Sequence, residues 1–142
     1  MSELPESVHA QIRDYCAQGD EAAGRGEYQE ALDRYNAAFA LVPEPRTDWH
    51  ASTWIMGAIG DACFTGGYFT TARTSLEYAM HCPDGLGNPF LHLRLGQTLF
   101  EQGDCERAAD ELMRAFMGAG DEIFAAEDPK YRAFLATRAK LD

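Results

Sequence analysis

Three stretches of this chain align without gaps, and the glycines they share restrict the possible folds more than any other feature. Each stretch starts at a glycine and has a second glycine seven residues later. An alanine follows, and a large residue and another alanine stand four and seven positions after it. A pattern repeated in this way indicates an array of similar units. The aligned columns are Gly19, Gly60 and Gly96; Gly26, Gly67 and Gly103; Ala31, Ala72 and Ala108; Tyr35, Leu76 and Leu112; and Ala38, Ala79 and Ala115.

Each unit is predicted to be a pair of antiparallel helices. A glycine in the middle of the first helix lets the second helix approach closely, and the second glycine stands where the first helix ends and turns, a position that favours positive φ. The two alanines and the large residue between them share one face of the second helix. One such pair cannot bury its own apolar face, so consecutive pairs must stack. The predicted fold is all-α: an array of antiparallel helix pairs with three repeats.

The repeat resembles the tetratricopeptide repeat family over residues of about 10 to 120. In the first unit, the series G-x-Y-x-x-A-x-x-x-Y-x-x-A from Gly26 and the closing Pro43 match the family pattern. The other units depart from it, because Asp84 and Gly120 stand where the first unit has Pro43. The repeats are also spaced by 41 and 36 residues, against about 34 in the family. The resemblance implies an α-solenoid, here a single domain over 1–142 with repeats at about 10–43, 51–84 and 87–120 and a C-terminal cap at 121–142.

Helix boundaries follow from capping residues and from the apolar periodicity. Asn88 followed by Pro89 is a typical helix start, and Asp128 with Pro129 repeats it. A seventh helix is therefore predicted over 130–140, where its apolar residues would cover the open end of the last repeat. The apolar residues between 118 and 128 predict a short helix there. The first six helices are predicted over 8–24, 28–42, 49–65, 69–81, 89–102 and 105–118.

The resemblance implies a concave groove lined by the first helices, in which such proteins usually hold a peptide or a partner's helix. Aromatic and charged residues alternate in the columns that approach this groove, a texture typical of specific protein-binding surfaces. Two alternatives stay open: Phe64 and Phe100 pack between repeats instead, or the columns are filled by the chain's own C-terminal helix or by a second copy. The candidate partner-binding residues are Arg13, Asp20, Trp54, Asp61, Phe64, Phe90, Arg94, Gln97 and Phe100.

Charge and hydropathy limit the partners. The 142 residues carry a formal net charge of −11, which repels nucleic-acid backbones and anionic membrane surfaces. The chain has neither an apolar run long enough to cross a membrane nor a visible signal peptide, so a cytoplasmic protein is expected. Residues 49–90 hold only three acidic groups and one basic group but seven of the sixteen aromatic residues. This charge-poor, aromatic-rich middle predicts a contact surface, either for a partner or for a homodimer.

Catalysis, metals and cofactors are not expected. The four histidines, at positions 9, 50, 81 and 92, form no H-x-x-x-H or H-E-x-x-H pair that would bind a metal. The four cysteines have no C-x-x-C spacing, so neither a zinc site nor a disulfide framework is predicted. His81 and Cys82 are adjacent, and neighbours on a helix do not face each other as a nucleophile and its base must.

The sequence therefore predicts a non-catalytic protein-binding module. Small acidic tetratricopeptide proteins of this size resemble bacterial immunity proteins that neutralise a secreted toxin, and the segment from Gly118 to Leu135 resembles the ends of small tetratricopeptide proteins associated with toxin loci. The partner would be a toxin or a secreted effector, and a basic toxin would be attracted by the charge of −11. The alternatives are a chaperone of type III secretion translocators and a general adaptor or homodimeric scaffold.

Overall fold

The computed structural model describes residues 4–141, and all regular structure within that range is helical. No β-strand occurs in this range, so the predicted all-α class is confirmed. Two short 3-10 helices accompany the α-helices: η1 (Arg46–Asp48) and η2 (Asp121–Phe124). Across residues 4–141 the α-helices are α1 (Glu6–Gly24), α2 (Tyr28–Ala40), α3 (His50–Gly66), α4 (Phe69–Ala79), α5 (Pro89–Glu101), α6 (Cys105–Ala119) and α7 (Pro129–Ala136).

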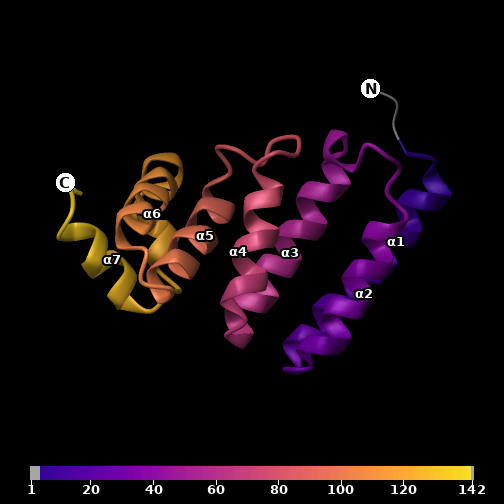
Figure 1. The fold of residues 1–142 in the computed structure, drawn as a ribbon, viewed down its shortest axis with the longest axis horizontal. Helices are drawn as coiled ribbons and strands as arrows, with labels where there is room; N and C mark the ends of the chain where they lie inside the picture. The colour runs from indigo at the N-terminus through magenta and orange to yellow at the C-terminus, as the bar shows by residue number, and fades with distance from the viewer. Residues whose placement is uncertain (1–3, 142) are drawn as a thin grey trace.

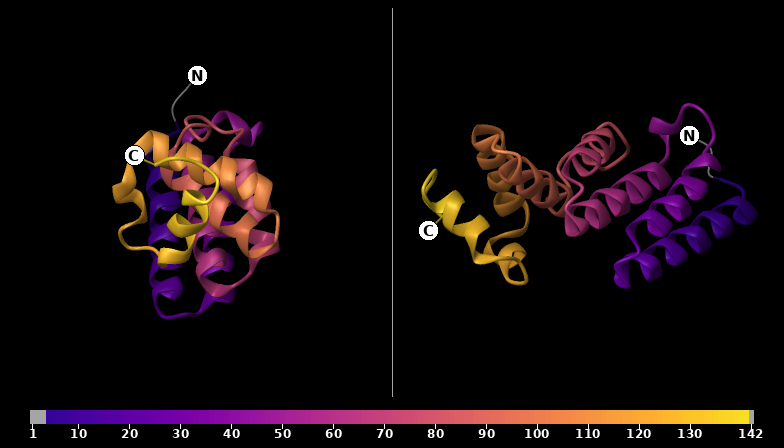
Figure 2. Two further views of the ribbon diagram at one scale, coloured as in Figure 1. Left: turned by 90° about the vertical axis from the view of Figure 1, so that its left-hand side faces the viewer. Right: turned by 60° about the horizontal axis from the view of Figure 1, so that its bottom comes forward.

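Helices that are adjacent in the chain pack as pairs: α1 with α2, α3 with α4, and α5 with α6. The second helix of one pair contacts the first helix of the next, and the first helices α1, α3 and α5 also contact one another in order. Figure 1 shows the pairs in a row, with α1 and α2 at one end and α6 and α7 at the other. The right-hand view of Figure 2 shows the same order, and the left-hand view looks along the row from its C-terminal end.

The first glycine of each unit lies where a large side chain of the second helix presses on the first helix. A Cβ added to Gly60 would overlap the side chain of Leu76, and the equivalent glycines meet Tyr35 and Leu112 in the same way. The alanines on either side of these large residues are fully buried. The predicted reason for the glycine column, close approach of two helices, is therefore confirmed.

The second glycine of each unit ends the first helix. Gly67 follows α3 with a φ of 84°, in the left-handed region that a side chain disfavours. Beyond it the backbone N–H of Tyr68 donates to the carbonyl of Cys63 at 2.7 Å, which satisfies an end of the helix. Gly26 and Gly103 have φ values of 78° and 83°. The positive φ predicted for this column is confirmed at all three positions.

The predicted boundaries of the first six helices agree with the observed ones to within two residues. α7 is the exception, because it ends at Ala136 and not at the predicted Lys140. The N–H groups of Arg138 and Ala139 both donate to the carbonyl of Leu135, so the chain makes one tight turn and does not continue as a helix. The short helix predicted between 118 and 128 is η2.

The C-terminal segment, defined as residues 120–136, packs on the last helix pair. η2 contacts α5 and α6, and α7 contacts α6 and η2. Three buried residues of the segment, Phe124, Tyr131 and Leu135, form one apolar cluster with buried residues of α5 and α6. A second, larger cluster runs through the first two pairs and into α5. The segment therefore completes the core at this end of the row.

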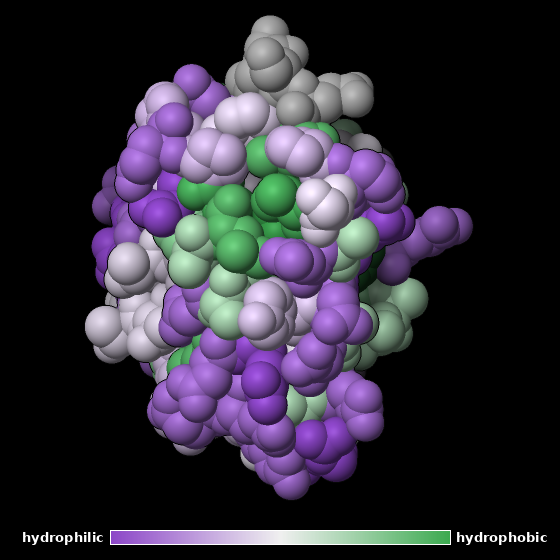
Figure 3. All heavy atoms as spheres, turned by 90° about the vertical axis from the view of Figure 1, so that its right-hand side faces the viewer, coloured by the Kyte–Doolittle hydropathy of each residue, from purple (hydrophilic) through white to green (hydrophobic). Residues whose placement is uncertain are grey.

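The opposite end of the row, formed by α1 and α2, has an apolar area of its own. Figure 3 looks onto this end and shows hydrophobic side chains gathered in its upper half, with hydrophilic side chains around them. Val8 and Tyr15 of α1 and Leu41, which follows α2, are partly buried and pack against the core cluster.

Within residues 4–141, no helix combines the length and apolar character needed to cross a bilayer.

The contact between Gly60 and Leu76 predicts a sharp difference between two glycine variants. Gly60→Ala should lower the free energy of unfolding by about 2 kcal/mol, because the added methyl group would overlap the side chain of Leu76, which already contacts this part of α3. A Cβ on Gly24 meets no atom within 4 Å, so Gly24→Ala should change stability by less than about 1 kcal/mol. Urea unfolding followed by circular dichroism measures both, and equal effects would contradict the close-packing role of the glycine column.

Candidate functional site

Two aromatic side chains on the first helices are half exposed. Trp54 of α3 is 48% exposed and Phe90 of α5 is 42% exposed. They occupy equivalent positions, six residues before the first glycine of their units. α5 comes close to α3 beside them, since a Cβ on Gly57 would lie 3.0 Å from Cδ2 of Leu91. Both aromatic residues therefore lie within one helical turn of the contact between their helices.

Arg94 of α5 is the most highly connected side chain on these helices. Its Nε donates to Oδ1 of Asp61 at 2.7 Å and its Nη1 donates to Oε1 of Glu127 at 2.6 Å. Its Cζ lies 4.8 Å from the ring centroid of Phe90 and 5.4 Å from that of Phe64, within cation–π range. Burial by itself lowers the pKa of Arg94, but the two carboxylates outweigh it and raise the pKa. The guanidinium stays charged and joins α3, α5 and the C-terminal segment.

Glu127 brings the C-terminal segment across α5. Its Oε1 also accepts a hydrogen bond from Nε2 of Gln97 at 2.7 Å, and Arg94 donates to Oε1 of the same glutamine at 2.7 Å. Gln97 is fully buried. A partner would therefore meet Glu127 before Gln97. Sequence reasoning did not identify Glu127, because it lies in the connection between η2 and α7, where no periodicity indicates which way a side chain points.

Tyr131 of α7 fills the space between the ends of α3 and α5. Its ring centroid lies 6.2 Å from that of Phe64 and 5.5 Å from that of Phe100, and its hydroxyl donates to Oε2 of Glu101 at 2.8 Å. Lys130 pairs with the same carboxylate oxygen at 2.8 Å. A cavity of about 490 Å³ remains beside Phe64, Lys130 and Tyr131. Phe64 and Phe100 therefore pack against the chain's own C-terminal segment.

The two candidates on α1 stand apart from this junction. Arg13 is exposed and pairs with Glu6 at 3.2 Å. Oδ1 of Asp20 accepts a hydrogen bond from the hydroxyl of Tyr35 at 2.6 Å. Burial raises the pKa of Tyr35, the hydrogen bond to Asp20 raises it further, and the charge of Asp61 adds to the shift. Asp20 thus holds the Tyr35 hydroxyl, and Asp61 stands at the equivalent position on α3, a helix that contacts α1.

The nine sequence-predicted residues thus separate into two groups. In the covered group, each side chain packs directly on the C-terminal segment, through Glu127 or Tyr131. In the open group, each side chain keeps a large part of its surface exposed on α1, on α3 or at the start of α5. The covered group is Phe64, Arg94, Gln97 and Phe100, and the open group is Arg13, Asp20, Trp54, Asp61 and Phe90.

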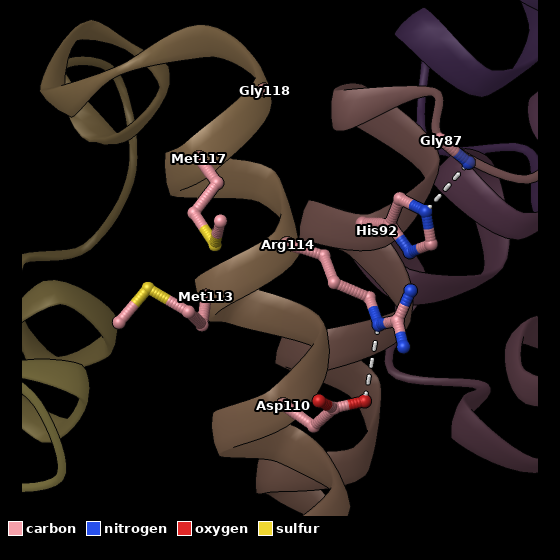
Figure 4. Close-up of a pocket in the computed structure, with 7 residues that line it drawn as sticks. All are labelled: Gly87, His92, Asp110, Met113, Arg114, Met117 and Gly118. Atoms are coloured by element: carbon pink, nitrogen blue, oxygen red, sulfur yellow. Dashed lines mark hydrogen bonds and ion pairs between the residues drawn. The ribbon is translucent and has the colours of Figure 1, made fainter.

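A second cavity, of about 510 Å³, lies between the start of α5 and α6. Figure 4 shows His92 and Arg114 reaching into it from these two helices. Nε2 of His92 accepts from the N–H of Gly87 at 2.9 Å, and Nδ1 lies 2.6 Å from Oε2 of Glu111. Nε2 is thus unprotonated and Nδ1 carries the proton that Glu111 accepts. Both nitrogens are engaged, and the pair was not visible in the sequence because its members lie 19 residues apart on different helices.

The thiols of Cys16 on α1 and Cys63 on α3 are held in their neutral form. Burial raises the pKa of Cys63 to about 11. Burial, followed by the charge of Asp20, raises the pKa of Cys16 to about 11 as well. A raised pKa is the reverse of what a nucleophilic or metal-binding cysteine needs. Within residues 4–141, no group of three or more metal-ligating side chains comes together.

The two groups predict different costs for removing a phenylalanine. Phe100→Ala should lower the free energy of unfolding by about 3 kcal/mol, because its ring packs on Tyr131 and Phe134 in the apolar cluster. Phe90→Ala should cost about half of that or less, since 42% of its surface is already exposed. Chemical denaturation of both variants measures the difference. Equal costs would contradict the separation into covered and open groups.

The pairing of Glu101 predicts an acid-sensitive C-terminal segment. Burial by itself raises the pKa of Glu101, but hydrogen bonds from Lys130 and Tyr131 outweigh it and lower the pKa. Because the pKa of Glu101 is depressed, its ionised form stabilises the folded state at any pH above the unfolded pKa, about 4.3. This contribution is lost as the pH falls through the lower pKa of the folded state. The melting temperature should therefore drop less between neutral and acidic pH in Glu101→Gln than in wild type, with Glu122→Gln as the control. An equal drop in all three would contradict this pairing.

No protein-family model matches the chain, and no curated protein matches it.

Proposed function

We propose that this chain is a non-catalytic protein-binding module of the tetratricopeptide repeat type, and that the open group of residues on α1, α3 and α5 binds its partner. Two features of the helix pairs support the assignment to this type. The large residue of each second helix presses on a glycine of the first helix, and each first helix ends at a glycine of positive φ. Both features belong to the columns on which the resemblance rests.

The exposure of Trp54 and Phe90 carries the proposal. α3 is otherwise mostly buried, with Ile55, Met56 and Ile59 all in the core, so an exposed tryptophan is not a general feature of that helix. Large aromatic side chains beside charged groups are enriched at the centres of protein-binding surfaces. The guanidinium of Arg94 lies over the ring of Phe90 and pairs with Asp61, which is on the same helix as Trp54.

The engaged state of the reactive groups supports a binding role over a catalytic one. Proton transfer by His92 would first have to break a hydrogen bond to Gly87 or to Glu111. Cys16 and Cys63 are held as thiols by their raised pKa values. An exposed aromatic pair needs no such activation to contribute to binding.

The specific role that we propose is that of a bacterial immunity protein, which binds a cognate toxin and covers its active site. This role rests on the resemblance of the chain to small acidic immunity proteins and on its net charge of −11. A toxin that attacks nucleic acid is commonly basic, so opposite charges would speed its encounter with this chain.

Capture and co-expression test the proposal together. The immobilised wild-type chain should capture a partner from a lysate of its source cells, and the Trp54→Ala/Phe90→Ala variant should capture about tenfold less, as for two central interface residues. Met117→Ala, which removes a 77% exposed side chain of α6, should capture as much as wild type. The captured protein, expressed alone in a bacterium, should stop growth, and co-expression of wild type but not of the double variant should restore it.

The other outcomes of this experiment select other functions. A harmless partner that enters a secretion system would favour a translocator chaperone, and recovery of only the chain itself would favour a homodimeric scaffold. If the double variant captures the partner as well as wild type does, the binding surface lies elsewhere. Circular dichroism of the variant must show a folded protein for the comparison to hold.

A further inference from the structure

The charges of the open group indicate which kind of segment it accepts, and this inference rests on the proposed function. Asp20 and Asp61 follow directly after the first glycines of their units, at equivalent positions on α1 and α3. Each uses Oδ1 to accept a hydrogen bond, from Tyr35 and from Arg94 respectively. Within residues 4–141, Oδ2 of either carboxylate has no hydrogen-bond donor, so each can still accept one from outside.

The two exposed aromatic residues lie at a fixed distance from these carboxylates. Trp54 precedes Asp61 by seven residues on α3, which places them on one face of the helix and about 10 Å apart along its axis. Phe90 lies one turn from Arg94 on α5 and stacks on its guanidinium. A segment that lies across α3 from Trp54 toward Asp61 would therefore meet an apolar patch first and an acidic patch second.

Arg94 demonstrates the chemistry that a partner side chain would meet here. Its guanidinium lies over the ring of Phe90 and donates to a carboxylate oxygen of Asp61. Aromatic faces and carboxylates together attract a cation more strongly than either does alone, and tryptophan is the best of the aromatic rings for this purpose. The ring of Trp54, which is more exposed than that of Phe90, has the ring of His9 packed edge-on against it with 5.3 Å between the centroids. Among residues 4–141, neither an arginine nor a lysine lies over the Trp54 ring.

The charge of the whole chain favours the same sign of partner. A net charge of −11 attracts basic segments and repels acidic ones. The C-terminal segment limits how far a bound segment extends along α5, because Glu127 and Tyr131 already cover Gln97 and Phe100. What remains is a short surface, with room for a few side chains.

We propose that the open group docks a short basic segment of the partner protein, with an apolar side chain against Trp54 and Phe90 and an arginine or lysine on Asp20 and Asp61. The occupant is thus a cationic, partly apolar stretch of another protein. An acidic stretch would meet two carboxylates and an acidic chain, and Arg13, the basic member of the open group, already pairs with Glu6. We therefore expect an acidic stretch to be disfavoured on this surface.

Two fluorescent pools of short peptides test the proposal on the full chain. Both pools have random apolar residues, and one has arginine or lysine where the other has glutamate. The basic pool should bind at least about tenfold more tightly, since like charges at a binding surface cost several kcal/mol. Asp20→Asn/Asp61→Asn should weaken binding of the basic pool by about tenfold, and Asp33→Asn/Glu106→Gln, with the same change in net charge on α2 and α6, should weaken it by less than about threefold.

Three results would overturn the inference. One is no binding of the basic pool, another is equal binding of the two pools, and the third is an equal effect of the two double variants, which would show a response to net charge alone.

Asp61→Asn also removes the negative charge that pairs with Arg94, so Asp20→Asn alone serves as the second variant. It should weaken binding of the basic pool by about threefold. The proposed function is judged separately: it fails when Trp54→Ala/Phe90→Ala captures its partner normally, whichever peptide pool binds.

Discussion

The structure depends on one contact that is repeated three times: the backbone of a first helix pressed against a large side chain of the second. Gly19, Gly60 and Gly96 make this approach possible, because a Cβ at any of them would overlap Tyr35, Leu76 or Leu112. The contact fixes which face of each first helix is turned inward to its own pair. It thereby also fixes which face is left for neighbouring pairs and for solvent, and Trp54 and Phe90 are half exposed on that remaining face.

Much of the fold could be predicted because its causes are local. A glycine seven residues from another glycine, followed by a small–large–small stripe, determines the helix pair, its turn and its packing within about forty residues of chain. The helix boundaries followed from capping residues such as Asn88, whose side chain accepts hydrogen bonds from the N–H groups of Phe90 and Leu91. α7 was predicted too long, because the tight turn at Leu135 has no capping residue or proline to mark it.

The candidate site could be predicted only in part, because half of it depends on contacts between distant segments. Glu127 reaches Arg94 from 33 residues away through a connection without periodicity. Tyr131 was expected to help cover the last repeat, but its insertion between Phe64 and Phe100 depends on the path of that same connection. The alternative in which the chain's own C-terminal segment occupies the columns therefore applies to α5 and to Phe64 near the end of α3. Arg13, Asp20 and Trp54 keep exposed surfaces on α1 and α3.

Hydrogen–deuterium exchange with and without the captured partner tests whether the partner binds to the exposed face of the first helices, as we propose. We expect slower exchange in α1, in α3 and in the first turn of α5 when the partner is present, with unchanged exchange in α2, α4 and α6. Slower exchange confined to the second helices, or to α1 and α2 without α3 and α5, would contradict the proposed binding surface.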